Sequence, residues 1–304
     1  MPRRARLRIE QGEAFYHLYC KAACYMDEMP FEKRGAKEKF IEVVRHFAEV
    51  YCCRVYAFCV MGNHYHLVMG FDEKRELARK DLERRAKAFY PSERSAEWIA
   101  DGWGADQWER LSRRVFDVSE LMRNVHQAYA HWYNKTFDRR GRFWAERFKS
   151  TILEDGRAVE DCMMYVELNP IRAGLVERPE AYTASSFRLR CLKLDVWLAP
   201  LQKVMGAPAK EALLRYRELV YHRGAVPSKE GQSAIREDVL ATEAARGFAE
   251  SGVFLNRIRH FTRGLVVGSE LRIKEWLADF RERSLYRRRV NPIPLPSGGL
   301  ASLR

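Results

Sequence analysis

The N-terminal part of the chain alternates between strand-like and helix-like patterns of apolar positions. Residues 14–25 (AFYHLYCKAACY) are rich in aromatic residues and predict a strand. Residues 36–51 repeat apolar positions at helical spacing and predict an amphipathic helix. The apolar face of that helix consists of Phe40, Val43, Val44, Phe47 and Val50. Two β-type runs, CRVYAFCVM and HYHLVMG, follow, and Gly62-Asn63 between them predicts a hairpin with a tight turn.

Further helical patterns follow this hairpin. Residues 73–88 predict a highly charged helix, and residues 92–104 predict an irregular loop. Asp117 and Glu120 form a capping box, which predicts a helix from there to about residue 137.

A basic, aromatic segment joins that helix to a second strand-helix pair. Residues 138–149 (DRRGRFWAERFK) predict a loop that leads into a short strand at 149–153. The next helix begins near Gly156 and has to end before Pro170, because proline disfavours helical geometry in the residue before it.

The order of these elements predicts an α+β fold, in which helices pack on an antiparallel sheet. Beyond residue 190 the pattern predicts helices alone, at 208–222, 232–249, 251–261 and 269–283. The end of the chain, YRRRVNPIPLPSGG, is basic and broken by prolines, and we expect it to be flexible. The predicted organisation is therefore a main domain at 1–190, an all-helical region at 191–285 and a tail at 286–304.

The charge balance changes the picture from a fold to a class of partner. The 304 residues include 54 Lys and Arg against 41 Asp and Glu, a formal net charge of +13. A positive field attracts polyanions, so nucleic acid is the expected partner and an anionic membrane surface the alternative. The sequence has no run of about 18 apolar residues, so we expect no membrane-spanning helix. The N-terminus lacks an apolar segment, so we expect no signal peptide.

The seven cysteines are odd in number and lie in mostly apolar surroundings. We interpret them as reduced packing residues of a cytosolic protein, without a disulfide or zinc framework.

Two histidines in the second strand of the hairpin suggest a metal site. Side chains two apart on a strand point to the same face, so His64 and His66 project together and Tyr65 projects to the other face. Two adjacent imidazoles can hold one divalent cation. Alone the motif is weak, and a pair of surface histidines is the competing interpretation.

A phenol and an amide lie one helical step apart further along the chain. Tyr165 and Asn169 are four residues apart in MMYVELNP, so a continuous helix would put them on nearly the same face. The amide oxygen is a possible third ligand for a hard cation. A partly buried tyrosine and a helix-end asparagine form the alternative. Tyr129 is the second candidate phenol, ranked lower because it lies within an apolar stripe typical of a core.

The segment 138–149 interleaves cations with aromatic residues. Arginines grip phosphates, and aromatic rings stack on unpaired bases, which favours nucleic-acid binding over a solvated loop with its aromatic residues in the core. The candidate DNA-binding residues are Arg139, Arg140, Arg142, Trp144, Arg147 and Lys149.

Three motifs in order, MGNHYHLVMG, GRFWAERFKSTIL and YVELNPIRAGLVERPEAYTASSF, resemble the REP-associated tyrosine transposases, relatives of the single-tyrosine (HUH) transposases of small insertion sequences. The resemblance covers roughly residues 10–190 and implies an HUH, ferredoxin-like catalytic domain. It implies Mg²⁺ or Mn²⁺ binding by His64, His66 and Asn169, with Tyr165 as the nucleophile. The chain departs from the family pattern at Gly62, where proline is common, and at Tyr65, which is bulkier than the usual aliphatic residue.

The resemblance further implies metal-dependent cleavage and strand transfer of single-stranded DNA through a covalent 5′-phosphotyrosine. The expected substrates form hairpins, such as repetitive extragenic palindromes (REP), and the expected location is the nucleoid in the cytoplasm of a bacterium. The protein would act as a monomer or a homodimer.

Two other functions stay open. One is a domesticated regulator that binds DNA hairpins without cutting them, and the other is a metal-dependent phosphoesterase that uses water as the nucleophile. Within the C-terminal region, FLNRIRHFTRGLVVGSELRIKEWLADF fits either a helix-turn-helix or an ordinary helical hairpin.

Overall fold

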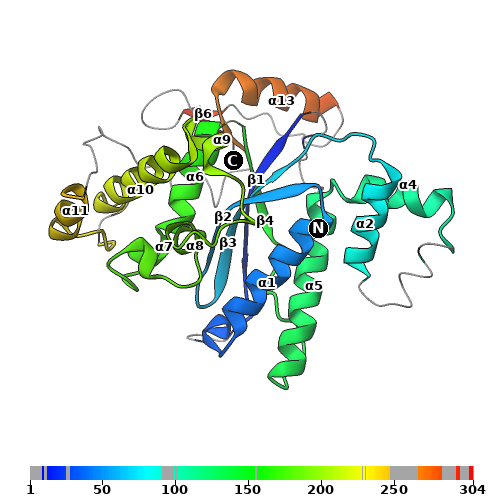
Figure 1. The fold of residues 1–304 in the computed structure, drawn as a ribbon, viewed down its shortest axis with the longest axis horizontal. Helices are drawn as coiled ribbons and strands as arrows, with labels where there is room; N and C mark the ends of the chain where they lie inside the picture. Colours follow the sequence, from blue (N-terminus) through cyan, green and yellow to red (C-terminus); the bar gives the residue numbers. More distant parts are fainter. Residues whose placement is uncertain are drawn as a thin grey trace.

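Four antiparallel strands form the centre of the protein in the computed structural model (Figure 1). The structure describes residues 9, 12–24, 28–90, 99, 102–154, 156–227, 229, 231–246, 266–282, 292–294 and 301–303. In spatial order the central strands are β2 (Cys53–Val60), β3 (His64–Phe71), β1 (Ala14–Lys21) and β4 (Lys149–Leu153). All neighbouring pairs among these four strands are antiparallel, which confirms the predicted α+β class.

The predicted hairpin at Gly62-Asn63 joins β2 to β3. The Met61 amide donates to the His64 carbonyl over 2.8 Å and closes the turn. A Cβ added at Gly62 would lie 2.8 Å from the Met29 sulfur, so glycine lets the preceding segment pack close to this turn. That segment carries the short 3₁₀ helix η1 (Pro30–Glu32).

Two long helices cover one face of the sheet. They are α1 (Ala36–Val50) and α5 (Val118–Thr136), which contact each other, and the Phe40 ring of α1 lies 4.6 Å from the Tyr65 ring of β3. Asp117 caps α5 by accepting hydrogen bonds from the amides of Ser119 and Glu120, as predicted. Glu120 binds Arg114 and Arg123 through its side chain.

The helix α6 (Gly156–Glu167) covers the opposite face, where it contacts β2 and β3. The chain then breaks at Leu168 and resumes as α7 (Asn169–Arg172). The predicted end before Pro170 is therefore close to the true end of α6, but Pro170 itself is helical. Proline is tolerated in a first helical turn because its missing N–H has no intrahelical partner there.

A helical insertion projects on one side of the sheet, at the right of Figure 1. It contains α2 (Arg79–Phe89) and α4 (Ala105–Arg114), with its own small apolar cluster around Trp108 and Leu111. The predicted charged helix at 73–88 thus begins later than expected. The predicted loop at 92–104 lies mainly outside the described residues.

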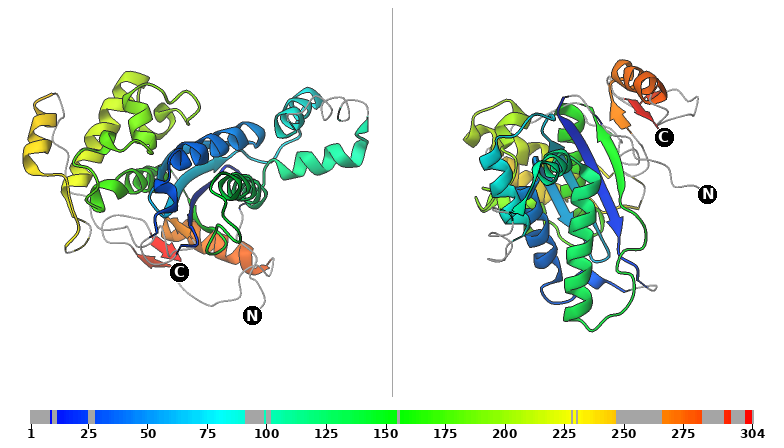
Figure 2. Two further views of the ribbon diagram at one scale, coloured as in Figure 1. Left: turned by 90° about the horizontal axis from the view of Figure 1, so that it is seen from below. Right: turned by 90° about the vertical axis from the view of Figure 1, so that its right-hand side faces the viewer.

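Helices on the other side of the sheet carry the chain past residue 180 (Figures 1 and 2). They are η2 (Pro179–Ala181), α8 (Ser186–Cys191), α9 (Leu201–Met205), α10 (Ala209–Ala225) and α11 (Glu237–Ala244). The predicted helix at 208–222 is confirmed, whereas the one predicted at 232–249 is shorter. The one predicted at 251–261 lies outside the described residues.

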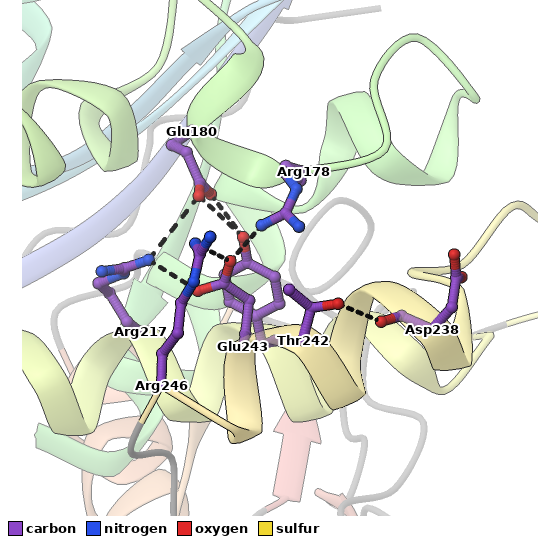
Figure 3. Close-up of polar contacts among 8 residues, drawn as sticks. Arg178, Glu180, Arg217, Asp238, Thr242, Glu243 and Arg246 are labelled. Atoms are coloured by element: carbon purple, nitrogen blue, oxygen red, sulfur yellow. Dashed lines mark hydrogen bonds and ion pairs between the residues drawn. The ribbon is translucent and has the colours of Figure 1, made fainter.

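A compact ion-pair network joins α11 to α10 and to the segment before η2 (Figure 3). Glu243, whose side chain is buried, accepts hydrogen bonds from Arg178, Arg217 and Arg246. Arg217 also lies 3.8 Å from Glu180, which binds the Tyr221 hydroxyl.

The C-terminal region is not all helical, which corrects the prediction. Besides α13 (Glu270–Glu282), it contains three short strands, β5 (Val266–Gly268), β6 (Ile293–Pro294) and β7 (Ala301–Leu303). They extend the sheet beyond β4 in the order β5-β7-β6, and β5 runs parallel to β4.

Two further predictions about the C-terminal region fail because short strands occur there. Described parts of the expected flexible tail are strands, and β5 occupies the middle of the proposed helix-turn-helix, where a turn between helices was required. Strands of two or three residues carry too little periodicity to be recognised in the sequence.

Candidate active site

One face of the central sheet collects the polar residues of β3, β1 and β4. In the observed register Tyr19 lies opposite His66, Lys21 lies opposite His64, and Lys149 of β4 lies opposite Tyr19. Residues directly opposite each other share a face of the sheet. The two histidines therefore stand in a row of aromatic and cationic side chains contributed by three strands.

His17 of β1 is the partner of His66 and was missed by the sequence analysis. The two imidazoles are stacked at an interplanar angle of 7°, and His17 Nε2 lies 3.0 Å from His66 Nδ1, within hydrogen-bond distance. Both are almost fully buried, at 1% and 2% exposure. Burial, followed by the neighbouring imidazoles, holds the pKa of His66 well below its usual value. His66 is therefore neutral at neutral pH.

His64 lies at the more open end of the same strand. Its Nδ1 donates to the side-chain oxygen of Asn63 over 2.7 Å. Burial, with a smaller effect from the positive charge of Lys21, lowers the pKa of His64 to about 4. His64 is thus also a neutral imidazole at neutral pH, the form that binds metal ions.

Tyr165 of α6 packs edge-on against both buried imidazoles. Its ring centroid lies 5.5 Å from that of His66 and 5.8 Å from that of His17. The side chain is 8% exposed. Burial raises the pKa of its hydroxyl above the ordinary value, whereas the positive charge of Arg172 acts in the opposite direction.

Asn169 is the first residue of α7, not a member of the same continuous helix as Tyr165. Its Nδ2 donates to the carbonyl oxygens of Tyr165 at 2.9 Å and Val166 at 3.1 Å, so the amide is held at the end of α6. The predicted continuous helical step is therefore wrong, yet the side chain still folds back toward the turn of Tyr165.

The three expected metal ligands share a property that suits a cation. One polar atom of each side chain is already engaged: Nδ1 in both histidines and Nδ2 in Asn169. The Nε2 atoms and the amide oxygen are then the atoms suited to ligation, with the outer hydrogen bonds orienting them. Within the described ranges, no group of three or more His, Cys, Asp and Glu side chains is placed to hold a metal ion.

Tyr129, the second candidate nucleophile, lies on the other side of the sheet. It belongs to α5, is fully buried, and donates its hydroxyl hydrogen to the Ala36 carbonyl oxygen over 3.1 Å. Its ring packs against Phe31 and Phe40 on the face to which Tyr65 points. The structure thus places Tyr129 in the core, separated from His66 by the sheet.

The aromatic residues of the basic segment are also part of the core. Phe143, Trp144 and Phe148 are buried. The Trp144 ring stacks on His126 at 3.9 Å and its Nε1 donates to the His126 carbonyl. Trp144 is therefore not presented for stacking on a base in this structure. For the aromatic residues of this segment, the alternative interpretation of rings packed in the core applies.

The cations of the segment divide into two groups. Arg139 is half-buried and donates to the Ala23 carbonyl over 2.7 Å, so it ties the loop to the end of β1. Arg140, Arg142, Arg147 and Lys149 are exposed. Lys149 also pairs with Glu146 at 2.9 Å.

Arg142 and Arg147 line a surface cavity of about 750 Å³ between this segment and α5. Arg123 and His126 of α5 also line the cavity. Its lining includes two acidic residues, Glu120 and Glu146. The sequence analysis missed Arg123 and His126 because they lie in an ordinary helical pattern. Only their position opposite the loop in the structure identifies them as cavity residues.

All seven cysteines are free thiols, as predicted. Among the described residues, no helix has the length and apolarity required to cross a membrane.

Comparisons with known proteins show a likeness to a solved structure. No protein-family model matches the chain, and no curated protein sequence matches it. A solved structure of a REP-associated tyrosine transposase bound to a REP hairpin is similar to this chain with a TM-score of 0.42 and 12% sequence identity. The likeness covers 64% of this chain and 87% of that one.

Proposed function

We propose that this protein cleaves and rejoins single strands of hairpin-forming DNA through a covalent bond to Tyr165, with a divalent cation such as Mg²⁺ or Mn²⁺. The observation that carries the proposal is the packing of the Tyr165 ring on His66 and His17, on the one face of the sheet that presents two neutral imidazoles. The motifs that resemble REP-associated tyrosine transposases include β3, which carries both histidines, and the end of α6, which carries Tyr165.

The reaction exchanges one phosphodiester for another. The Tyr165 oxygen forms a bond to phosphorus, the bond to the 3′ oxygen breaks, and the proton lost by the phenol is regained at the departing 3′ oxygen. The products are a 5′-phosphotyrosine and a 3′ hydroxyl, so rejoining needs no external energy source. A phenol is a weak nucleophile at neutral pH.

His64, His66 and Asn169 would hold the cation, which when bound polarises the phosphate oxygens. The other residues act around it. His17 and Asn63 orient the two imidazoles through Nδ1. Lys21 and Lys149 stand at the edge of the same face and would contact the DNA backbone. Arg142 and Arg147 line the cavity beside α5 and would offer further cations to the DNA backbone there.

The decisive test is a suicide assay with labelled single-stranded hairpin DNA and Mn²⁺. We expect a covalent protein–DNA adduct in the wild type and in Tyr129→Phe, and its loss in Tyr165→Phe. Tyr129→Phe is a matched control because it removes one hydroxyl from the core without touching the histidine face. The reverse pattern would contradict the proposal.

A non-cleaving hairpin-binding regulator is the second candidate. The observation that favours it is the burial of Tyr165, whose hydroxyl has a raised pKa and little access to solvent. It predicts hairpin binding without an adduct in any variant. Cleavage without an adduct would indicate a phosphoesterase that uses water.

A further inference from the structure

Arg172, the last residue of α7, is a buried arginine with unsatisfied N–H groups. The side chain is 9% exposed, and its Nε and Nη1 atoms are buried with no hydrogen-bond partner among the residues that the structure describes. Arg190, another buried arginine, differs because it donates to the carbonyls of Tyr56 and Ala199. A native buried polar group without a partner requires an explanation.

The surroundings of Arg172 make its burial more costly. Arg223 of α10 lies close enough for its positive charge to lower the pKa of Arg172, although burial is the larger cause, and together they bring it to about 10. Arg223 is itself paired with the buried Asp161 at 2.5 Å. Arg223 therefore has a carboxylate partner and also acts on Glu160, whereas the Arg172 guanidinium lies beside a second cation.

Tyr165 is another neighbour of Arg172. Each side chain acts electrostatically on the pKa of the other: Arg172 favours the phenolate, and the phenolate favours the guanidinium. An anion that reached the Tyr165 oxygen would enter the field of this unpaired cation. A guanidinium offers paired N–H groups whose geometry fits two oxygens of a phosphate.

We propose that Arg172 binds the backbone phosphate that lies at the Tyr165 hydroxyl and remains bound to it while it is attached to the tyrosine. The inference rests on the proposed function, because it takes the position of the phosphate from the nucleophile. Arg172 is then unpaired in the free protein because its partner arrives with the DNA.

The first test measures thermal unfolding of the full chain in sodium phosphate and in sodium chloride of equal ionic strength. Phosphate should raise the melting temperature of the wild type by roughly 2–4 °C more than chloride does, once it exceeds its dissociation constant several-fold. The increment should vanish in Arg172→Gln and persist in the control Arg157→Gln, which changes an exposed arginine of α6. Equal increments in all three proteins would overturn the proposal.

Stability in chloride separates ligand binding from a structural role. Arg172→Gln should melt at the same temperature as the wild type or higher, because it removes a buried charge that has no partner. Arg223→Gln should melt lower, because it removes the guanidinium that pairs with the buried Asp161. A large loss of stability in Arg172→Gln, with Arg172→Lys also destabilised, would show that the guanidinium has a structural partner and would overturn the proposal.

Binding of hairpin DNA with a single-stranded extension, measured in the Tyr165→Phe background, provides the last readout. Arg172→Gln should weaken binding by about tenfold, as expected for a lost charged hydrogen bond. It should also reduce the slope of log affinity against log salt by about 0.7, the value for one phosphate of a single strand. If Arg172→Gln leaves the affinity and the salt slope unchanged while the protein with Tyr165 still forms the adduct, only the proposal for Arg172 is refuted and the proposed function survives. A missing adduct with these effects present would refute only the nucleophile.

Discussion

His17 shows how a residue outside the proposed set of metal ligands can orient one of them, His66. When His66 Nδ1 donates a hydrogen bond to His17 Nε2, the tautomer of His66 carries its lone pair on Nε2. Stacking of the two rings and their near-complete burial hold that orientation. The sheet register, which places His17 beside the histidine pair, is what makes this contact possible.

We expect His17→Phe to weaken Mn²⁺ binding to the full chain by about 10–100-fold, the range typical of outer partners of metal-bound histidines. The phenyl ring fills the site but accepts no hydrogen bond from His66. Titration calorimetry with Mn²⁺ measures the effect, and His131→Gln, at an exposed position of α5, is the control. Equal Mn²⁺ affinity in His17→Phe and wild type would show that His17 only packs.

At the scale of elements, α6 carries the candidate nucleophile and also the carboxylate that anchors the helix. Glu167 is fully buried and accepts hydrogen bonds from the Ser186 and Tyr216 hydroxyls. Ser186 in turn bonds to the backbone of Phe58 in β2, so the end of α6 is fixed to the sheet, to α8 and to α10. Burial raises the pKa of Glu167 to about 7, although the charge of Arg190 and both hydroxyls oppose the shift.

This anchor predicts a pH dependence of stability. The folded pKa of Glu167 exceeds its unfolded value, so the folded state binds the proton more tightly. The contribution to stability is full below the unfolded pKa and is lost as pH rises through about 7. We expect Glu167→Gln to remove roughly 1–3 kcal/mol of that loss between pH 5 and 8, since one pKa unit is worth about 1.4 kcal/mol. Urea unfolding at both pH values measures the difference from wild type, and parallel pH profiles would contradict it.

At the scale of the whole molecule, elements from the C-terminal half surround the central sheet from two directions. The short strands β5, β7 and β6 continue the sheet beyond β4, which also carries Lys149 at the site. On the other side, α10 and α11 are joined through the ion pairs of Glu243 (Figures 2 and 3). The short strands thus cover the edge of β4. The helix α10, which α11 contacts, packs next to α6.

We expect Glu243→Gln to lower the free energy of unfolding by about 3–5 kcal/mol, because three arginines lose the buried carboxylate that pairs with them. Asp238→Asn on the same helix is the matched control. Its ion pair with Arg236 is exposed and screened by solvent, so its loss should change the free energy of unfolding far less. Similar losses in the two variants, measured by urea unfolding, would show that the network does not stabilise this part of the molecule.

Local features of this protein were predictable from the sequence because their causes are local. Period-two and helical patterns located the central strands and the helices α1 and α5, the Gly62-Asn63 pair located the hairpin, and Asp117 located a helix start. The alternation along β3 was enough to send His64 and His66 to one face and Tyr65 to the other. These outcomes depend only on neighbours within a few residues.

The tertiary structure decided what depends on pairing between distant segments. Strand register brought His17 to His66, the break at Leu168 changed how Asn169 is held, and core packing buried the Trp144 ring that had been assigned to DNA. Tertiary structure also decided the strands β5 to β7, which are too short to exist without the sheet they extend. It likewise buried Arg172, whose Nε and Nη1 atoms have no hydrogen-bond partner among the described residues. The sequence by itself determined which side chains are available for chemistry. Packing and register determined which of them meet, because burial and hydrogen bonding act between residues that only the fold brings together.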